Sequence, residues 1–209
     1  MSDPLAAPSR RTQRERSAAT QAALLDAAID CLIAEGYANT TTSRVAARAG
    51  LSRGAHLHHF QTRAALVAAA VERFASRRVA ELQREIERLP RGPDRTYRAL
   101  DLLWRVYSGP LFQAAVDLFA AARTDEELRA SLSRFERVIA RDTVRLCGDL
   151  FAEQAERADF PELLELVLST IRGLALLDIV QPGTGAADTQ WRYCRGRLHA
   201  LLELPPATP

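Results

Sequence analysis

A chain of 209 residues that is 47% hydrophobic and 26% charged can bury a core of ordinary size, which excludes an intrinsically disordered protein. Its net charge of only +2 argues against a protein that coats DNA without regard to sequence, because such binding depends on many cations that neutralise phosphates. The charge is uneven, with +3 in residues 1–63 and −1 in residues 64–209. This distribution suits a protein that contacts nucleic acid with one end.

The first 16 residues predict a flexible basic arm. Residues 10–16 (RRTQRER) hold four arginines and one acid, and such a segment either enters a DNA minor groove or remains a solvated leader. The start lacks a basic region followed by an apolar run, so it does not resemble a secretory signal. No apolar run approaches the length of a membrane-spanning helix, and we therefore expect a cytoplasmic protein.

The periodicity of the chain indicates helices throughout and no strand. Caps and breakers divide it into about nine helices, at residues 17–35, 42–49, 52–59, 62–88, 95–107, 111–122, 124–154, 161–180 and 186–204. We expect Thr62 to cap the fourth helix, and Thr124 with Glu127 to form a capping box at the seventh. Pro161 occupies a first-turn position of the eighth. The predicted fold class is all-α.

The segment Thr40–Phe60 (TTTSRVAARAGLSRGAHLHHF) predicts two short helices joined by a tight turn. Thr41 and Thr42 offer hydroxyl caps before an apolar-periodic run. Gly50 ends that helix, because glycine accepts a left-handed conformation, and the small Ala46 lets the next helix cross closely. The second helix is cationic and fits a DNA major groove. An ordinary helical hairpin is the alternative.

Two further motifs flank this segment. An apolar helix, LLDAAIDCLIAEGYANTT, ends at Gly36 and Tyr37 just before it, and QTRAALV opens a long helix just after it. Residues 20–74 thereby resemble the N-terminal domain of TetR-type transcriptional regulators, over roughly a quarter of the chain. The resemblance implies a helix-turn-helix DNA-binding domain at 17–62, an effector-binding and dimerisation domain at 63–204, and a loose tail at 205–209.

Base reading and phosphate binding require different side chains. Arginine pairs with guanine through two hydrogen bonds, a small side chain allows close approach, and the family places a base contact near the start of the first of these helices. The expected base-reading residues are Arg44, Arg53, Gly54 and Ala55. The N-terminus of a helix and cationic side chains both favour phosphate binding. Arg63 matches a family position that is usually lysine. The expected phosphate-binding residues are Thr41, Thr42, His58, His59 and Arg63.

Two positions depart from the family pattern. His56 stands where an aliphatic residue is usual, and Leu57 stands where a tyrosine is usual. Either Leu57 turns inward and His56 outward, or the helix is rotated. Burial costs less for leucine than for imidazole, so we expect the first arrangement, with His56 as a further DNA-binding residue. The histidines of HLHH do not share one helix face, which disfavours a metal site, and no cofactor is expected.

The helix expected at 161–180 is apolar almost all the way round, so it should be buried on more than one side. Together with the last helix it resembles the dimer interface of the family, whereas a central core helix of a monomer is the alternative. The expected interface residues are Leu166, Ile171, Gly173, Leu174, Leu177, Trp191, Leu198 and Leu202.

Aromatic residues gather between residues 104 and 135, where the family keeps its effector cavity. Core packing explains such a cluster equally well. The expected ligand-binding residues are Leu103, Trp104, Tyr107, Phe112, Val116, Phe119 and Phe135. Asp101, Arg105 and Asp117 are candidates for a polar contact with a largely apolar effector.

The cysteines, Cys31, Cys147 and Cys194, have neither zinc nor disulfide spacing; we expect buried free thiols, with a redox sensor as the alternative. No nucleophile–base–acid set indicates an enzyme. The predicted function is a homodimeric repressor that a small-molecule effector releases from a palindromic double-stranded operator. An activator, or a regulator without an effector, is the alternative on the same scaffold.

Overall fold

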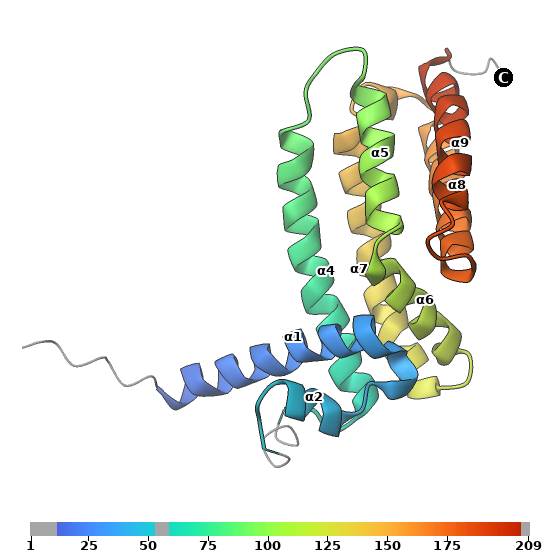
Figure 1. Cartoon of the computed structure of the whole chain (residues 1–209). Coiled ribbons are helices and arrows are strands. Elements are labelled where there is room, and N and C mark those ends of the chain that lie inside the picture. The colour runs from blue at the N-terminus through green and yellow to red at the C-terminus, as the bar shows by residue number, and fades with distance from the viewer. Residues whose placement is uncertain (1–11, 53–58, 206–209) are drawn as a thin grey trace, which may run out of the picture. The chain divides into compact units, whose positions relative to one another are not determined.

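The computed structural model describes residues 12–52 and 59–205, and all regular elements within these ranges are helical (Figure 1). They are α1 (Gln13–Asn39), α2 (Thr42–Arg48), α4 (Arg63–Glu87), α5 (Arg95–Tyr107), α6 (Pro110–Ala122), α7 (Glu126–Leu150), the 3₁₀ turn η1 (Gln154–Glu156), α8 (Phe160–Val180) and α9 (Ala186–Glu203). The predicted all-α class is confirmed. The chain divides into two units, Met1–Val71 and Glu72–Pro209, and the division falls within α4.

The first unit is built on α1. Helix α1 begins at Gln13, earlier than predicted, because Thr12 and Glu15 form a reciprocal capping box. Residues 13–16 of the expected arm are therefore helical. Leu24, Ala28 and Leu32 recur at a spacing of four and are buried, which gives the helix one apolar face.

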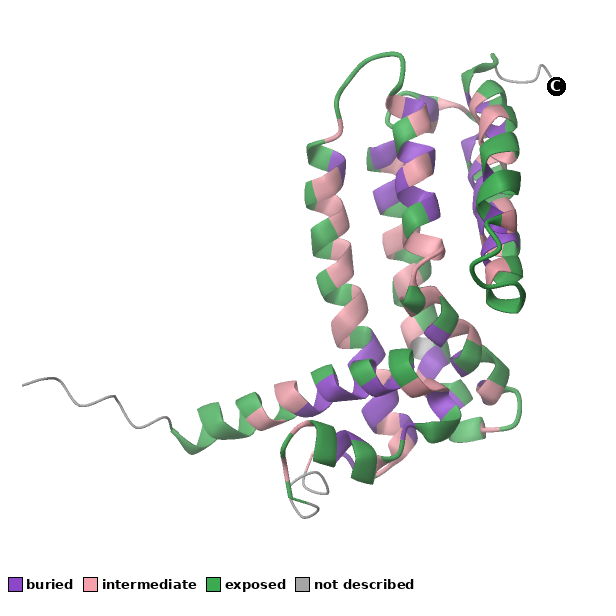
Figure 2. Ribbon diagram, in the orientation of Figure 1, coloured by how far each residue is buried: buried purple, intermediate pink, exposed green. Residues whose placement is uncertain are grey.

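Contrary to the sequence-based expectation, α1 is long and apolar enough to cross a membrane by length and composition. Eight of its residues are nevertheless buried in the protein, as the core helix of a globular unit requires. Near its end Gly36 leaves the helical conformation with φ 70°, and the Thr40 hydroxyl donates a hydrogen bond to the Gly36 carbonyl at 2.8 Å. The buried residues of α1 begin at Leu24, in the part of the helix that packs within the unit (Figure 2).

In the second unit, α8 packs against α9, and both pack against α5. Trp104 and Trp191 stack at the centre of this core with ring centroids 5.2 Å apart. The Trp104 indole N–H donates to Asp188 at 3.0 Å, and that of Trp191 donates to Asp101 at 3.2 Å. Each buried indole therefore has a polar partner, as tryptophan burial requires.

The expected bounds of α7 were wrong at both ends. Its N-cap is Asp125, whose carboxylate accepts a hydrogen bond from Leu128 N at 2.9 Å, and the expected box at Thr124 does not form. Aspartate at that position is an equally strong cap. The helix ends at Leu150 and η1 follows separately. At α8 the first-turn position of Pro161 is confirmed.

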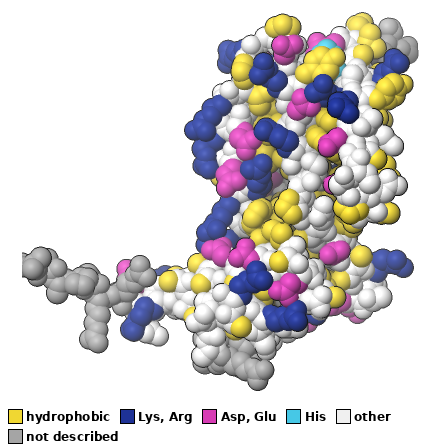
Figure 3. Space-filling model, in the orientation of Figure 1, with side chains coloured by type: hydrophobic (Ala, Val, Ile, Leu, Met, Phe, Trp, Pro, Cys, Tyr) yellow, Lys and Arg dark blue, Asp and Glu magenta, His cyan; other side chains and the backbone are white. Residues whose placement is uncertain are grey.

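Arginine side chains line the α4 edge of this unit, with acidic side chains beside them (Figure 3). Arg78 pairs with Glu81 at 3.0 Å and with Glu85 at 3.1 Å. The three side chains are 31%, 51% and 35% exposed, and ion pairs this close to solvent each contribute about 0–1 kcal/mol, so they add little to stability.

Candidate functional site

The turn between the two predicted DNA-contacting helices has a defined backbone up to its last described residue. The Thr41 hydroxyl accepts a hydrogen bond from Arg44 N at 3.3 Å and caps α2, as predicted. At the other end Gly50 has φ +68°, its N–H donates to Ala47 O, and Leu51 N donates to Ala46 O. This pair of hydrogen bonds is the Schellman motif, which confirms that Gly50 ends the helix.

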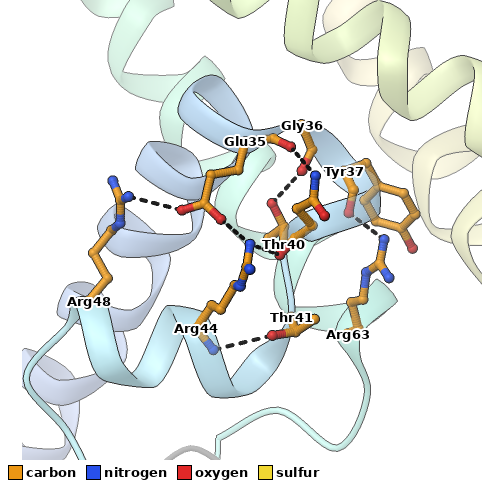
Figure 4. A network of polar contacts seen from close by, with 9 residues as sticks. Glu35, Gly36, Tyr37, Thr40, Thr41, Arg44, Arg48 and Arg63 are labelled. Carbon is orange, nitrogen blue, oxygen red and sulfur yellow. Dashed lines mark hydrogen bonds and ion pairs between the residues drawn. The ribbon is translucent and has the colours of Figure 1, made fainter.

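Glu35 of α1 holds α2 by two ion pairs (Figure 4). Its carboxylate lies 2.5 Å from Arg44 Nη1 and 3.1 Å from Arg48 Nη2. The Arg44 side chain remains 57% exposed, and its Nη1 also donates to the Asn39 carbonyl at 3.5 Å. Arg44, which is expected to read bases, is therefore oriented by Glu35. No sequence signal identified Glu35 or Arg48, because they pair across two helices and not within one.

Arg63, the first residue of α4, packs on the end of α1. Its guanidinium carbon lies 3.8 Å from the centroid of the Tyr37 ring, and Nη2 donates to the Tyr37 carbonyl at 2.5 Å. Thr62 caps α4, as predicted, by accepting a hydrogen bond from Ala65 N at 3.1 Å. Arg63 therefore joins α4 to α1, and its expected phosphate contact remains a prediction.

The structure brings Thr41, Thr42 and Arg44 together at the N-terminus of α2. His59 is half-buried just before the buried Phe60. The remaining expected DNA-binding residues lie outside the described residues; they are Arg53, Gly54, Ala55, His56 and His58. Leu57 lies outside them as well, so the alternative orientations of His56 and Leu57 remain predictions.

A small apolar cavity of about 60 Å³ lies within the second unit, between α4, α5 and α7. It is lined by Leu82, Ile86, Leu102, Leu103, Val106, Tyr107, Thr143, Leu146, Cys147 and Leu150. Only Leu103 and Tyr107 of the seven expected ligand-binding residues line it. The cavity residues of α7 were not predicted, because the prediction relied on aromatic residues. Helix α7 lines the cavity with Thr143, Leu146, Cys147 and Leu150, none of which is aromatic.

The other five expected ligand-binding residues lie elsewhere in the unit. Trp104 stacks on Trp191, and Phe112 packs edge-on against Tyr107 with centroids 5.4 Å apart. Val116 and Phe135 are half-buried outside the cavity lining, and Phe119 is 46% exposed.

None of the three polar candidates lines the cavity either. Asp101 accepts hydrogen bonds from Trp191 and Arg195, Arg105 pairs with Glu85 at 3.6 Å, and Asp117 is exposed.

Cys147 is 1% exposed and lines the cavity. Burial raises the pKa of its thiol to about 12, and the nearby charge of Arg172 opposes that rise. Because the thiolate is the reactive form, we expect Cys147 in the folded protein to react with iodoacetamide at pH 8 roughly a thousandfold more slowly than an ordinary exposed cysteine. Mass spectrometry of the alkylated peptides tests this, with the half-buried Cys194 as internal comparison and denatured protein as control. Rapid native alkylation of Cys147 would contradict it.

The expected interface residues fall into two groups. Ile171, Leu174, Trp191, Leu198 and Leu202 are buried in the core of their own unit, and do not face outward toward a second copy. An apolar pattern on a helix cannot distinguish burial in the core of its own unit from burial against a second copy. Leu166 and Leu177 are 45% and 40% exposed, and Gly173 is also exposed.

These three residues belong to one exposed stripe of α8. With the half-buried Thr170 and the exposed Val180 they repeat at alternating spacings of four and three residues, which is the spacing of a helix–helix seam. We refer to Leu166, Thr170, Gly173, Leu177 and Val180 as the α8 stripe. Tyr193 and Leu201 of α9, and Leu204 just after it, are further exposed apolar residues, at 67%, 38% and 54%. Two neighbouring helices thus leave large apolar side chains in water.

Residues 24–70 match the family model described as bacterial regulatory proteins, tetR family. The HTH-type transcriptional regulator CymR of Pseudomonas putida is 32% identical over 177 residues, 83% of this chain and 86% of that protein. A transcriptional regulator of Rhodococcus sp. Rha1 has the same fold, with a TM-score of 0.65 and 20% identity over 89% of this chain and 99% of that one. The regulator FadR of Bacillus subtilis, in complex with stearoyl-CoA, gives a TM-score of 0.61 with 14% sequence identity. The match covers 87% of this chain and 96% of that one.

Proposed function

Since this chain belongs to the TetR family of bacterial DNA-binding transcriptional regulators, we propose that it is a homodimeric cytoplasmic repressor which a small effector releases from a palindromic operator. The observation that carries the DNA-binding part is the capped α2 followed by the Schellman turn at Gly50. This geometry ends one helix and redirects the chain at the point where the sequence predicts the next one. The family model matches the same segment.

In this proposal the helix predicted at 52–59 enters the major groove, and α2 presents Thr41 and Arg44 beside it. Glu35 sets the direction of Arg44 by holding one edge of its guanidinium, which leaves the remaining donors for a base or a phosphate. Arg48 shares the same carboxylate but lies one turn further from the N-terminus of α2. Arg44 therefore has the larger share in operator binding.

Three substitutions distinguish a direct contact of Arg44 with DNA from support of α2 by the ion pairs of Glu35. We expect Arg44→Ala to weaken operator binding by about 1–3 kcal/mol, because it removes a direct contact. Glu35→Ala and Arg48→Ala should each cost less than about 1 kcal/mol, because exposed ion pairs contribute little. Fluorescence anisotropy with labelled operator measures all three. Equal losses in the three variants would mean that Arg44 acts only as a brace for α2.

The α8 stripe supports the homodimer. Oligomers of one chain are mostly two-fold symmetric, and helices with apolar residues at such spacing pack along that stripe. No heavy atom lies within 4 Å of the position that a Cβ would occupy at Gly173, so this position is open to a close-packing partner helix. A two-fold dimer places two recognition helices in successive major grooves about 34–36 Å apart, which explains why the operator would be palindromic.

The cavity between α4, α5 and α7 supports effector control. Helix α4 runs without interruption from Arg63 in the first unit to Glu87 in the second, so a ligand that displaces Leu82 or Ile86 acts on the helix that begins at the DNA-binding unit. An effector changes DNA binding only through the difference between its affinities for the DNA-binding state and for the state that does not bind DNA. A coupling free energy of roughly 1–3 kcal/mol is ordinary.

A reporter gene placed downstream of the chain's own upstream DNA tests whether the protein represses or activates transcription. Repression predicts low expression that rises when the gene for this chain is deleted or when an effector is supplied. Lower expression after deletion would favour the activator on the same scaffold.

A further inference from the structure

The first turns of α1 extend beyond the core of their unit. Residues 13–19 are all exposed, and the first buried side chain of the helix is Leu24 (Figure 2). The reciprocal capping box of Thr12 and Glu15 nevertheless makes this segment helical from its start. We refer to residues 13–23 as the α1 extension. At 1.5 Å per residue it is about 16 Å long.

One face of the α1 extension continues the face of α1 that contacts α2. Glu35 pairs with Arg44 and Arg48 of α2, and Cys31 lies one turn before Glu35 on the same face. Residues three, four or seven positions apart share a face of a helix, so this face runs on through Leu24 to three polar side chains of the α1 extension. They are Thr20, Ser17 and Gln13.

Helix α2 runs in the opposite direction to α1, and its end points toward the α1 extension (Figure 1). Burial raises the pKa of the Cys31 thiol, and Arg48 opposes that rise more strongly than Arg44 does. Arg48, the last residue of α2, is therefore the nearer of the two to Cys31. The chain leaves α2 on the side of the α1 extension, and the helix predicted to enter the major groove follows at once.

Charged side chains on the α1 extension are separated by face. Arg14 and Arg16 lie one on each side of the polar face, because two positions correspond to a little more than half a helical turn. Neither arginine forms an ion pair within residues 12–52 and 59–205. The exposed acids Glu15 and Asp26, three turns apart, occupy the opposite face of the helix. One side of the α1 extension therefore combines two cations with neutral hydrogen-bonding groups and excludes acids.

This combination of side chains suits the phosphates of a DNA backbone. Arginine, hydroxyl and amide groups are the side chains that proteins use for most phosphate contacts. The α1 extension also belongs to the same unit as α2 and lies beyond the end from which the predicted recognition helix begins. Its length of about 16 Å spans roughly five base pairs, since one strand carries a phosphate every 3.4 Å.

We propose that the α1 extension is a second DNA-binding element, which binds backbone phosphates beside each operator half-site through Arg14 and Arg16. Phosphate contacts carry no sequence information, so this element lengthens the bound site and adds affinity without adding specificity. The proposal rests on the proposed DNA-binding function. Residues 13–16 were expected to belong to a flexible arm, whereas a helix fixes both arginines relative to α2.

A salt series tests the phosphate contacts, with fluorescence anisotropy on the chain's own upstream DNA between roughly 50 and 200 mM salt. We expect Arg14→Gln combined with Arg16→Gln to reduce the slope of log affinity against log salt by about 3. A dimer carries four of these arginines, and each phosphate contact contributes about 0.9 to the slope. At roughly 150 mM salt, binding should weaken by at least about tenfold.

Arg91→Gln combined with Arg98→Gln is the matched control, because it removes two exposed arginines of the second unit. A change of slope no larger in the Arg14 and Arg16 variant than in this control contradicts the phosphate contacts. Mass photometry without DNA should show the same oligomer for both variants. Dissociation of the Arg14 and Arg16 variant alone would assign the α1 extension to contact with a second copy and would likewise overturn the proposal.

A helix breaker distinguishes the helical contact from a flexible arm. Ala19→Pro retains both arginines but removes an intrahelical hydrogen bond and clashes with the carbonyl of Glu15. Ala19 is exposed, so the core of the unit should remain folded, which circular dichroism checks. We expect a salt slope close to that of the Arg14 and Arg16 variant. Hydroxyl-radical footprinting should lose protection only over about five base pairs outside each half-site. An unchanged slope and footprint would contradict a helical contact.

Failure of this contact is distinguishable from failure of the proposed function. If the Arg14 and Arg16 variant binds the upstream DNA as the unaltered chain does, the contact is refuted and the repressor stands. If the unaltered chain binds upstream and random DNA equally, the repressor is refuted. The salt slope on random DNA then decides the contact, because phosphate binding does not depend on sequence.

Discussion

Replacing Leu177 with arginine is expected to abolish both dimerisation and operator binding, with a loss of at least about a hundredfold in DNA affinity. Leu177 is an exposed residue of the α8 stripe, and two-fold symmetry places the new charge twice in one interface. An unpaired charge in a desolvated contact costs several kcal/mol, so the dimer separates. A single recognition helix then binds DNA weakly.

Analytical ultracentrifugation and operator anisotropy on the same samples measure the two effects together. Val144→Arg is the matched control, because Val144 is a 61% exposed apolar residue of α7 that lies outside the α8 stripe. The control should remain dimeric and bind DNA. A dimeric Leu177→Arg protein with unchanged operator affinity would show that the α8 stripe is not the interface.

Replacing Trp191 with alanine should destabilise the protein by about 3–5 kcal/mol, as large-to-small changes in a core do. The side chain is 3% exposed, stacks on Trp104 and donates to Asp101. In a chain of this length such a loss lowers the thermal midpoint by roughly 6–20 °C.

Differential scanning calorimetry measures the shift, with Trp191→Phe as the conservative comparison. Phenylalanine keeps an aromatic ring against Trp104 but loses the hydrogen bond to Asp101, so the expected loss is smaller, at about 1–2 kcal/mol. A loss below about 1 kcal/mol in Trp191→Ala would contradict the placement of this residue in the core.

Features with a local cause were predictable from sequence. Thr41, Gly50 and Thr62 act within four residues of their own position, through capping hydrogen bonds or a positive φ, and all three were predicted correctly. The Thr12–Glu15 box is equally local and was missed only because the basic arm was expected to continue through it.

Features that depend on contacts between helices were not predictable. Glu35 meets Arg44 and Arg48 only after α1 and α2 have packed, and Arg172 meets Tyr107 across 65 positions of the chain. The pattern of α8 likewise showed an apolar residue on almost every side. It could not show that Ile171 faces the core while Leu177 faces solvent.

The most direct test of the proposed function is a titration of the chain's own upstream DNA by mass photometry, with random DNA of equal length in competition. A dimeric repressor should form a complex of two chains on one palindromic site, at least about a thousandfold tighter than binding to the random DNA. Equal affinity for the two DNAs, or a complex containing one chain, would contradict a dimeric, sequence-specific regulator.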